Sequence, residues 1–156
     1  MATILVVDSE ESLRSVVSMI FSDKHIVLEA NDIQEALTIF NQHKLDLIII
    51  DVNTTGIRNI ELIRRGQELT GEVKIIAYSA SISSWDKYLA ILEAGADLCL
   101  PKAGNIDILE IAVSKLLCLE ADLDKVVEEV TALAKEKTIM AALIAGEDNI
   151  CRYNYI

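Results

Sequence analysis

Proline, glycine and cysteine are scarce in this chain, and basic residues are outnumbered by acidic ones. The 156 residues include one proline, six glycines and three cysteines, and 14 basic against 25 acidic residues give a net charge of −11. Cys99, Cys118 and Cys151 are far apart and form no Cys-x-x-Cys pair, which argues against a disulfide framework and against a thiolate metal site. Because nucleic-acid binding requires a basic surface, and no basic cluster is longer than Arg64-Arg65, we expect no direct contact with nucleic acid.

Long apolar segments and nucleotide-binding signatures are also missing. No stretch is long enough to cross a bilayer, and no basic leader precedes the first apolar run, so we expect a cytoplasmic protein without membrane contact. Neither GxxxxGK[ST] nor GxGxxG occurs, and His25 and His43 lie beside no candidate nucleophile. We therefore do not expect a conventional enzyme. With 52% hydrophobic residues, the chain has enough apolar surface for one domain with a buried core.

Short apolar runs alternate with helical patterns along most of the chain. The runs expected to be strands cover residues 4–7, 26–29, 45–50, 73–77 and 98–100. Between them, apolar residues recur at steps of three and four, which predicts five helices. Two cover residues 10–22 and about 57–69, one begins after residue 32, one ends near residues 94–95, and one begins near residue 105. This alternation predicts an α/β fold with a five-stranded, parallel, doubly wound sheet.

Four of the apolar runs end on a polar residue suited to phosphate chemistry. The segments ILVVD, LIIID, IIAYS and LCLPK end on Asp8, Asp51, Ser79 and Lys102. Because ligands of open α/β sheets bind beyond the carboxyl ends of the strands, we expect these side chains to meet. Asp51 would be the nucleophile and Asp8 a ligand of a divalent cation, while Ser79 and Lys102 would contact the phosphoryl oxygens. The pattern predicts metal-assisted phosphoryl transfer.

Each of these residues also has an ordinary structural explanation. Asp51 can open an Asx turn, and Asp8 with Glu11 matches a capping box for the first helix. Ser79 begins a serine-rich loop, and a lysine such as Lys102 is most often solvated. The functional interpretation therefore depends on the four side chains meeting at one edge of the sheet.

The motifs VVDSEE, DLIIIDVNTTG, IIAYSAS and EAGADLCLPK, taken together, resemble the receiver domain of two-component response regulators. The resemblance covers residues 2–119 and implies a flavodoxin-like fold with strand order 2-1-3-4-5, the order of the chemotaxis receiver. It also implies a phosphoryl group donated by a histidine kinase or phosphotransfer protein in the presence of Mg²⁺. A downstream protein partner would then read the modified surface.

The resemblance assigns a role to each residue of the site. Asp51 would be the phosphorylated aspartate, and the metal ligands would be Asp8, Asp51 and the backbone carbonyl of Asn53. Ser79 would be the hydroxyl that responds to the phosphoryl group, and Lys102 the lysine of the pocket.

The sequence departs from the family pattern at several positions. Ser9 replaces the second acid after the first strand, and Glu10 is a candidate substitute for it as a metal ligand. Thr55 stands where the family has a proline, and Cys99 replaces the aromatic residue of the fifth strand. Ala103 follows the pocket lysine in place of the family's proline.

Two functions are consistent with this pattern. The first is a response-regulator receiver that is phosphorylated on Asp51 and signals through protein contacts. The alternative is a phosphorylation-independent pseudo-receiver, which acts as a binding or dimerisation module and is favoured by Ser9, Thr55 and Cys99. We favour the first because Asp51, Asn53, Ser79 and Lys102 are all retained.

Beyond the predicted receiver domain (1–119) lies a predicted helical extension (120–156). We predict one helix from about residue 105 to 145, roughly 60 Å long at 1.5 Å per residue, which leaves the domain and pairs two copies of the chain. The alternative is two shorter helices, the second folded back on its own domain. Of eleven heptad positions all but Lys137 are apolar, and the eleven are Leu109, Ala112, Leu116, Leu119, Leu123, Val126, Val130, Leu133, Lys137, Met140 and Ile144.

Overall fold

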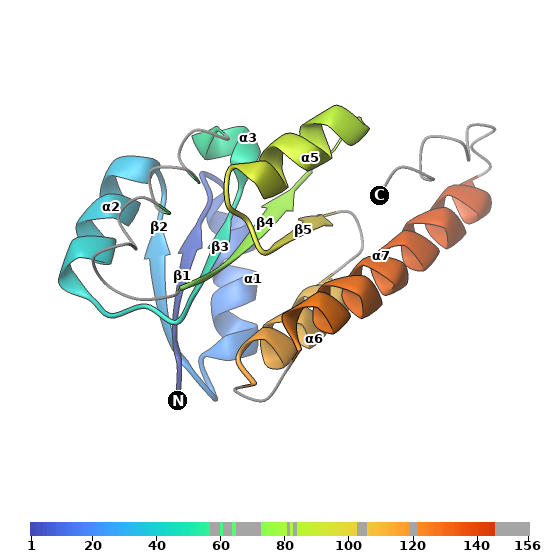
Figure 1. Ribbon diagram of the computed structural model, residues 1–156. Helices are drawn as coiled ribbons and strands as arrows, with labels where there is room; N and C mark the ends of the chain where they lie inside the picture. Colours follow the sequence, from blue (N-terminus) through green and yellow to red (C-terminus); the bar gives the residue numbers. More distant parts are fainter. Residues whose placement is uncertain are drawn as a thin grey trace.

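The fold is a parallel sheet with helices on both faces (Figure 1). The computed structural model describes residues 1–56, 60, 64, 73–80, 82, 84–102, 106–118 and 122–145. Within them the elements are β1 (Thr3–Val7), α1 (Glu11–Phe21), β2 (Ile26–Ala30), α2 (Ile33–Gln42), β3 (Leu47–Ile50), α3 (Val52–Thr55), β4 (Lys74–Ser79), α5 (Trp85–Glu93), β5 (Leu98–Pro101), α6 (Ile106–Leu116) and α7 (Leu123–Ala145).

The strand order confirms the predicted fold class. The sheet runs β2-β1-β3-β4-β5, and every neighbouring pair is parallel. Of the helix predicted at 57–69, only Ile60 and Arg64 lie within the described residues, and both are helical. No helix in the described part of the chain is both long and apolar enough to span a bilayer.

The sheet separates two apolar cores. All four residues of β3 are buried, as expected of a strand covered by helices on both faces. Alternate residues of β1 enter opposite cores: Ile4 and Val6 pack in the core that contains α1 and α6, and Leu5 and Val7 in the core that contains α2 and α5. This layering leaves the carboxyl ends of the strands as the place where polar side chains gather.

The C-terminal helix is present, but its predicted continuity with the preceding helix is wrong. α6 ends at Leu116 and α7 begins at Leu123, so the structure has the alternative arrangement of two helices with the second folded back. Asp122 starts α7, because its Oδ1 accepts a hydrogen bond of 3.2 Å from the backbone N–H of Asp124. The domain boundary predicted between residues 119 and 120 falls outside the described residues.

The apolar heptad face of α7 packs against the same chain. Val126 and Val130, two of the heptad positions, are buried in the core that α6 lines, and so is Ala134. Figure 1 shows α7 alongside α6, with the two helices running in opposite directions. A heptad pattern requires an apolar partner surface, and here the chain's own domain supplies that surface.

Candidate functional site

The carboxyl ends of four strands bring the predicted polar residues together. Asp8 follows β1, Asp51 follows β3, Ser79 ends β4, and Lys102 follows β5. Asp8 is 2% exposed, Asp51 5% and Ser79 0%, and they are the buried polar residues of the described part of the chain. The backbone N–H of Lys102 donates to the carbonyl of Ser79 over 2.9 Å, which joins the ends of β4 and β5.

Lys102 bridges the two buried carboxylates. Its Nζ lies 2.6 Å from Asp8 Oδ2 and 3.3 Å from Asp51 Oδ2. Burial alone would lower the pKa of Lys102, but the hydrogen bonds and negative charges of Asp8 and Asp51 outweigh it and raise that pKa. Lys102 therefore stays protonated and offsets one of two negative charges that are removed from water.

The second oxygen of each carboxylate is held by backbone. Asp8 Oδ1 accepts from the N–H of Glu10 over 2.9 Å, and Asp51 Oδ1 accepts from the N–H of Asn53 over 3.0 Å. The capping box predicted between Asp8 and Glu11 is thus not formed, because Asp8 bonds the residue before α1. The Asx turn considered for Asp51 is present and leaves Oδ2 facing Lys102. The structural explanation of Asp51 is therefore compatible with a role in the site.

Ser79 carries a hydroxyl without a partner. Its Oγ is fully buried, and no group in the described part of the chain hydrogen-bonds it. Such groups are rare because an unsatisfied buried hydroxyl costs about 1–3 kcal/mol. The Ser79 hydroxyl is thus available to an acceptor that enters the site.

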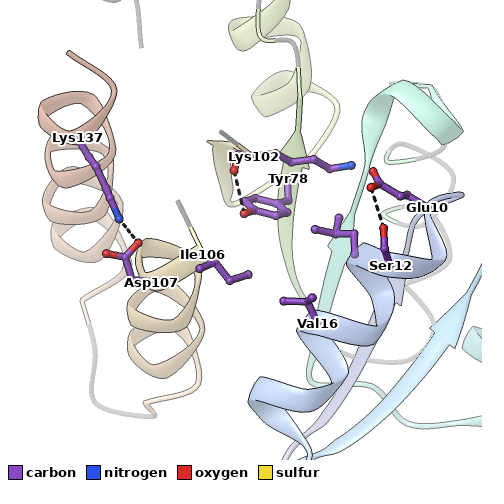
Figure 2. Close-up of a pocket in the computed structure, with 9 residues that line it drawn as sticks. Glu10, Ser12, Val16, Tyr78, Lys102, Ile106, Asp107 and Lys137 are labelled. Atoms are coloured by element: carbon purple, nitrogen blue, oxygen red, sulfur yellow. Dashed lines mark hydrogen bonds and ion pairs between the residues drawn. The ribbon is translucent and has the colours of Figure 1, made fainter. Parts of the chain in front are cut away.

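Glu10, the candidate substitute metal ligand, makes a local hydrogen bond in this structure, and its role as a ligand stays a prediction. It occupies the position before α1, and its Oε1 accepts from Ser12 Oγ over 2.9 Å. Figure 2 shows Glu10 beside a cavity of about 550 Å³ that is also lined by Tyr78, Lys102 and residues of α1 and α6. Within the described residues, no three His, Cys, Asp or Glu side chains gather as a ready-made metal site.

Tyr78 supports the backbone of Lys102, a contact that the sequence analysis missed. The Tyr78 hydroxyl donates to the Lys102 carbonyl over 3.3 Å (Figure 2). Burial, followed by the charge of Asp107, raises the pKa of Tyr78 to about 12, so the phenol stays neutral. Because successive side chains of a strand point to opposite faces, the sequence predicts that Tyr78 and Ser79 lie on opposite faces of β4. It does not predict the hydrogen bond between Tyr78 and the Lys102 carbonyl.

Two basic residues also reach the site from helices. Lys87 Nζ, on α5, donates to Asn53 Oδ1 over 3.3 Å, and Arg14, on α1, donates to the backbone carbonyl of Asp8 over 2.7 Å. The helical spacing of α1 indicates the face of the helix on which Arg14 lies, so its contact with Asp8 has some basis in the sequence. The contact between Lys87 and Asn53 has none. Both cations reduce the negative potential around Asp8 and Asp51.

Comparison with known proteins identifies the family. Residues 4–114 match the model of the response regulator receiver domain. The chain belongs to this family. α7 lies beyond the matched residues and is an addition to the receiver fold.

Individual relatives agree with the family model. The receiver is 36% identical over 98 residues to the phosphate regulon transcriptional regulatory protein PhoB of Pseudomonas aeruginosa, a match that covers 61% of this chain and 42% of that protein. The chain therefore spans less than half the length of this relative. Among solved structures, the chemotaxis protein CheY4 of Vibrio cholerae is 29% identical with a TM-score of 0.67, over 75% of this chain and 99% of that one.

A second solved structure carries a metal and a phosphoryl mimic. The response regulator TrrA of Thermotoga maritima, in complex with Mg²⁺-BeF, is 30% identical with a TM-score of 0.64. The likeness covers 75% of this chain and all (100%) of TrrA. Receiver domains accept phosphoryl groups, and they pair with histidine kinases or phosphotransfer proteins.

Proposed function

We propose that this receiver accepts a phosphoryl group on Asp51 from a histidine kinase or phosphotransfer protein, and signals through protein contacts. The observation that carries the proposal is the arrangement of the Asp51 carboxylate. One oxygen is held by the N–H of Asn53 and the other faces the ammonium of Lys102. A carboxylate fixed in this way can attack phosphorus while a cation offsets the charge on the transferring group.

The reaction exchanges one bond to phosphorus for another. An Asp51 oxygen bonds the phosphorus as the bond from phosphorus to the donor histidine nitrogen breaks, and the nitrogen keeps that electron pair. The product is an acyl phosphate on Asp51. Its oxygens would give the buried Ser79 hydroxyl an acceptor, which it lacks among the described residues, and Lys102 can contact the same oxygens from its position 3.3 Å from Asp51.

Mg²⁺ is the cofactor that we propose, and the residues present fit it. Mg²⁺ favours one or two carboxylates together with phosphate oxygens and waters. Asp8 and Asp51 supply two buried carboxylates whose Oδ2 atoms share the Lys102 ammonium, so a second cation has oxygen donors here. The backbone carbonyl of Asn53 would be the third ligand. When bound, Mg²⁺ supplies charge neutralisation for the transferring group.

The second candidate function is a phosphorylation-independent pseudo-receiver, a binding or dimerisation module. The observation that favours it is that Lys102 already offsets one of the two negative charges of the site from within by contacting both carboxylates. Ser9 supports the same alternative, because it leaves the site one acid short of the family pattern. Under this hypothesis the sheet and its helices would act as a fixed scaffold.

The output that we propose is a downstream protein partner rather than nucleic acid, in line with the net charge of −11. A homodimer through the C-terminal helix remains a proposal, and it would use the outer side of the α6–α7 pair, where Ile111 and Leu133 are exposed. The sparse cysteines, with Cys99 buried and unpaired, support a cytoplasmic location.

Chemical lability of the modification tests the proposed function. After incubation with a phosphorylated histidine phosphotransfer protein, we expect one phosphoryl group per chain that hydroxylamine removes, as expected of an acyl phosphate. Borohydride reduction followed by peptide mapping should place it on Asp51. A hydroxylamine-resistant modification on serine or threonine would contradict the proposal.

A further inference from the structure

α7 covers a surface of the receiver that would otherwise be open. It packs against the edge strand β5 and against α6, and it buries Val126, Val130 and Ala134 in the core beneath α6. In Figure 1, α7 runs along α6 and past the end of the sheet at β5. The family match ends at residue 114, so this covering helix lies outside the matched receiver domain.

Two ion pairs set the register between α6 and α7. Lys115 contacts Glu129, and Asp107 contacts Lys137. The pairs lie eight residues apart on each helix (115 − 107 and 137 − 129), and their polarity is reversed, since one cation is on α6 and the other on α7. The side chains are 39–58% exposed, so the pairs specify the alignment more than they strengthen it.

α7 also reaches α5 through Tyr88. The Tyr88 side chain is buried and packs in the core that contains Cys99 of β5. Burial raises the pKa of Tyr88, and a hydrogen-bonding interaction with the Thr131 side chain of α7 opposes that rise, although Thr131 Oγ1 makes no hydrogen bond of standard geometry within the described residues. The Tyr88 ring also stacks on Trp85, with ring centroids 5.3 Å apart. Contacts therefore run from β5 through α5 to α7.

The two ends of this path each contain an unsatisfied hydroxyl. Ser79 Oγ and Thr131 Oγ1 are the buried side-chain polar atoms without a hydrogen-bond partner in the described part of the chain. Ser79 ends β4 opposite Pro101, and two residues earlier Ala77 pairs with Cys99 of β5. A shift of Ser79 would therefore act on β5, the strand that carries Cys99.

We propose that α7 is a built-in ligand of the surface formed by α5, β5 and α6, and that phosphorylation of Asp51 weakens its docking. The inference rests on the proposed function. A phosphoryl group would draw Ser79 toward a new acceptor and disturb the packing of Cys99 and Tyr88. Release of α7 would in turn expose Thr131 to water, which satisfies its hydroxyl.

The released surface has a defined partner chemistry. It would accept an amphipathic helix with apolar residues at i, i+4 and i+8, the spacing of Val126, Val130 and Ala134. The partner helix would also carry an acidic residue at i+3, the position of Glu129, to pair with Lys115. A basic residue at i+11, the position of Lys137, would pair with Asp107. A partner helix of this kind would compete with α7 for the same contacts.

Hydrogen exchange in the full chain tests the coupling. With Mg²⁺ and beryllium fluoride as the phosphoryl mimic, we expect the amides of α7 to exchange roughly tenfold faster, within the 5–150-fold range of allosteric couplings. Binding of the mimic is followed independently through Trp85, the one tryptophan of the chain. If the mimic binds and α7 protection is unchanged, the inference is overturned while the proposed function stands. If no mimic or phosphoryl group binds under any condition, both fail.

If binding of the mimic weakens the docking of α7, then changes in the docking of α7 must change the affinity for the mimic by the same factor. Variants of α7 test this second expectation. Thr131→Val removes the unsatisfied hydroxyl, should hold α7 more firmly, and should weaken binding of the mimic several-fold. Val130→Asp should detach α7 and strengthen binding by a similar factor. Glu136→Gln, at an exposed position of α7, is the control and should change neither quantity. Equal affinities in Thr131→Val and Glu136→Gln would overturn the inference even if Val130→Asp fails to fold.

Discussion

The Lys102 ammonium lies 2.6 Å from Asp8 Oδ2, closer than the 3.3 Å that separates it from Asp51 Oδ2. The lysine of the pocket thus holds the carboxylate after β1 more tightly than it holds the proposed phosphoacceptor. A divalent cation that binds Asp8 must compete with this ammonium. Once displaced, Lys102 is close enough to Asp51 to meet an incoming phosphoryl group.

Replacing Lys102 with methionine should destabilise the metal-free protein by about 3 kcal/mol. The substitution leaves two buried carboxylates without their shared cation, and breaking a buried pair in this way costs roughly 3–5 kcal/mol. Urea unfolding in the presence of a chelator measures the loss. Millimolar Mg²⁺ should recover part of the lost stability, because the metal then takes the place of the ammonium.

Lys115→Met is the matched control for this prediction. It removes a lysine from an ion pair whose partners are 39% and 42% exposed, and pairs of this kind contribute less than about 1 kcal/mol. Equal losses in Lys102→Met and Lys115→Met would show that the bridge between Asp8 and Asp51 does not support the fold.

Alkaline pH should destabilise the protein partly through Tyr78. Its folded pKa is raised to about 12 from the ordinary value of 10.0. Stability from the neutral phenol is therefore fully present below pH 10 and is lost as pH rises toward 12, by about 2–3 kcal/mol in total. In Tyr78→Phe the loss of stability over this window should be smaller by about that amount.

Urea midpoints at pH 8, 10 and 11 for the wild type and Tyr78→Phe test this expectation, with about half of the difference, roughly 1.4 kcal/mol, already present at pH 11. The pKa of Lys102 is also raised, so its contribution to stability is likewise lost as pH rises. Because Lys102 is present in both proteins, this loss cancels when their stabilities are compared. At pH 8 the variant should lack only the hydrogen bond to the Lys102 carbonyl, about 1 kcal/mol. Parallel pH profiles would be incompatible with a buried neutral phenol.

Gly95→Ala should destabilise the protein by at least about 2 kcal/mol. Gly95 has φ +119°, and a Cβ there would collide with the side chain of Arg64. Besides the strained backbone, which costs about 1–2 kcal/mol, the substitution would displace Arg64 from Asp97 Oδ2 at 2.7 Å and from the Val73 carbonyl at 3.2 Å. Thermal or urea unfolding measures the change.

An Arg64→Ala background separates the two causes of that loss. With the arginine side chain removed, Gly95→Ala should cost only the backbone contribution, so the two substitutions should be non-additive. Strict additivity would mean that the close approach of Arg64 and Gly95 does not matter.

The sheet could be predicted from the sequence because its strands are buried on both faces. A strand such as β3, with Leu47 to Ile50 all buried, must be apolar throughout, and the predicted run at 45–50 contains it. The same logic located the site, since Asp8, Asp51 and Lys102 each follow directly on such a run. Position along a strand determines where a residue lies, but not the direction of a long side chain.

The predictions that stay open or that the structure overturned depended on the direction of a side chain or on the identity of a partner. Glu10 is next to the site in sequence, yet it lies before α1 and bonds Ser12. The heptad pattern identified the apolar face of α7, but it is equally compatible with a second chain or with the same domain. The hydrogen bond from the Asp124 N–H to Asp122, which starts a separate helix, went unrecognised because the apolar repeat continues across it.

The central claim is that Asp51 accepts a phosphoryl group with the help of Mg²⁺. The most direct measurement is the intact mass after treatment with acetyl phosphate, with and without Mg²⁺, for the wild type and Asp51→Asn. The account predicts a Mg²⁺-dependent gain of one phosphoryl group in the wild type and none in a folded Asp51→Asn variant. No gain in the wild type, either with acetyl phosphate or with a phosphorylated phosphotransfer protein, would contradict it and favour the pseudo-receiver.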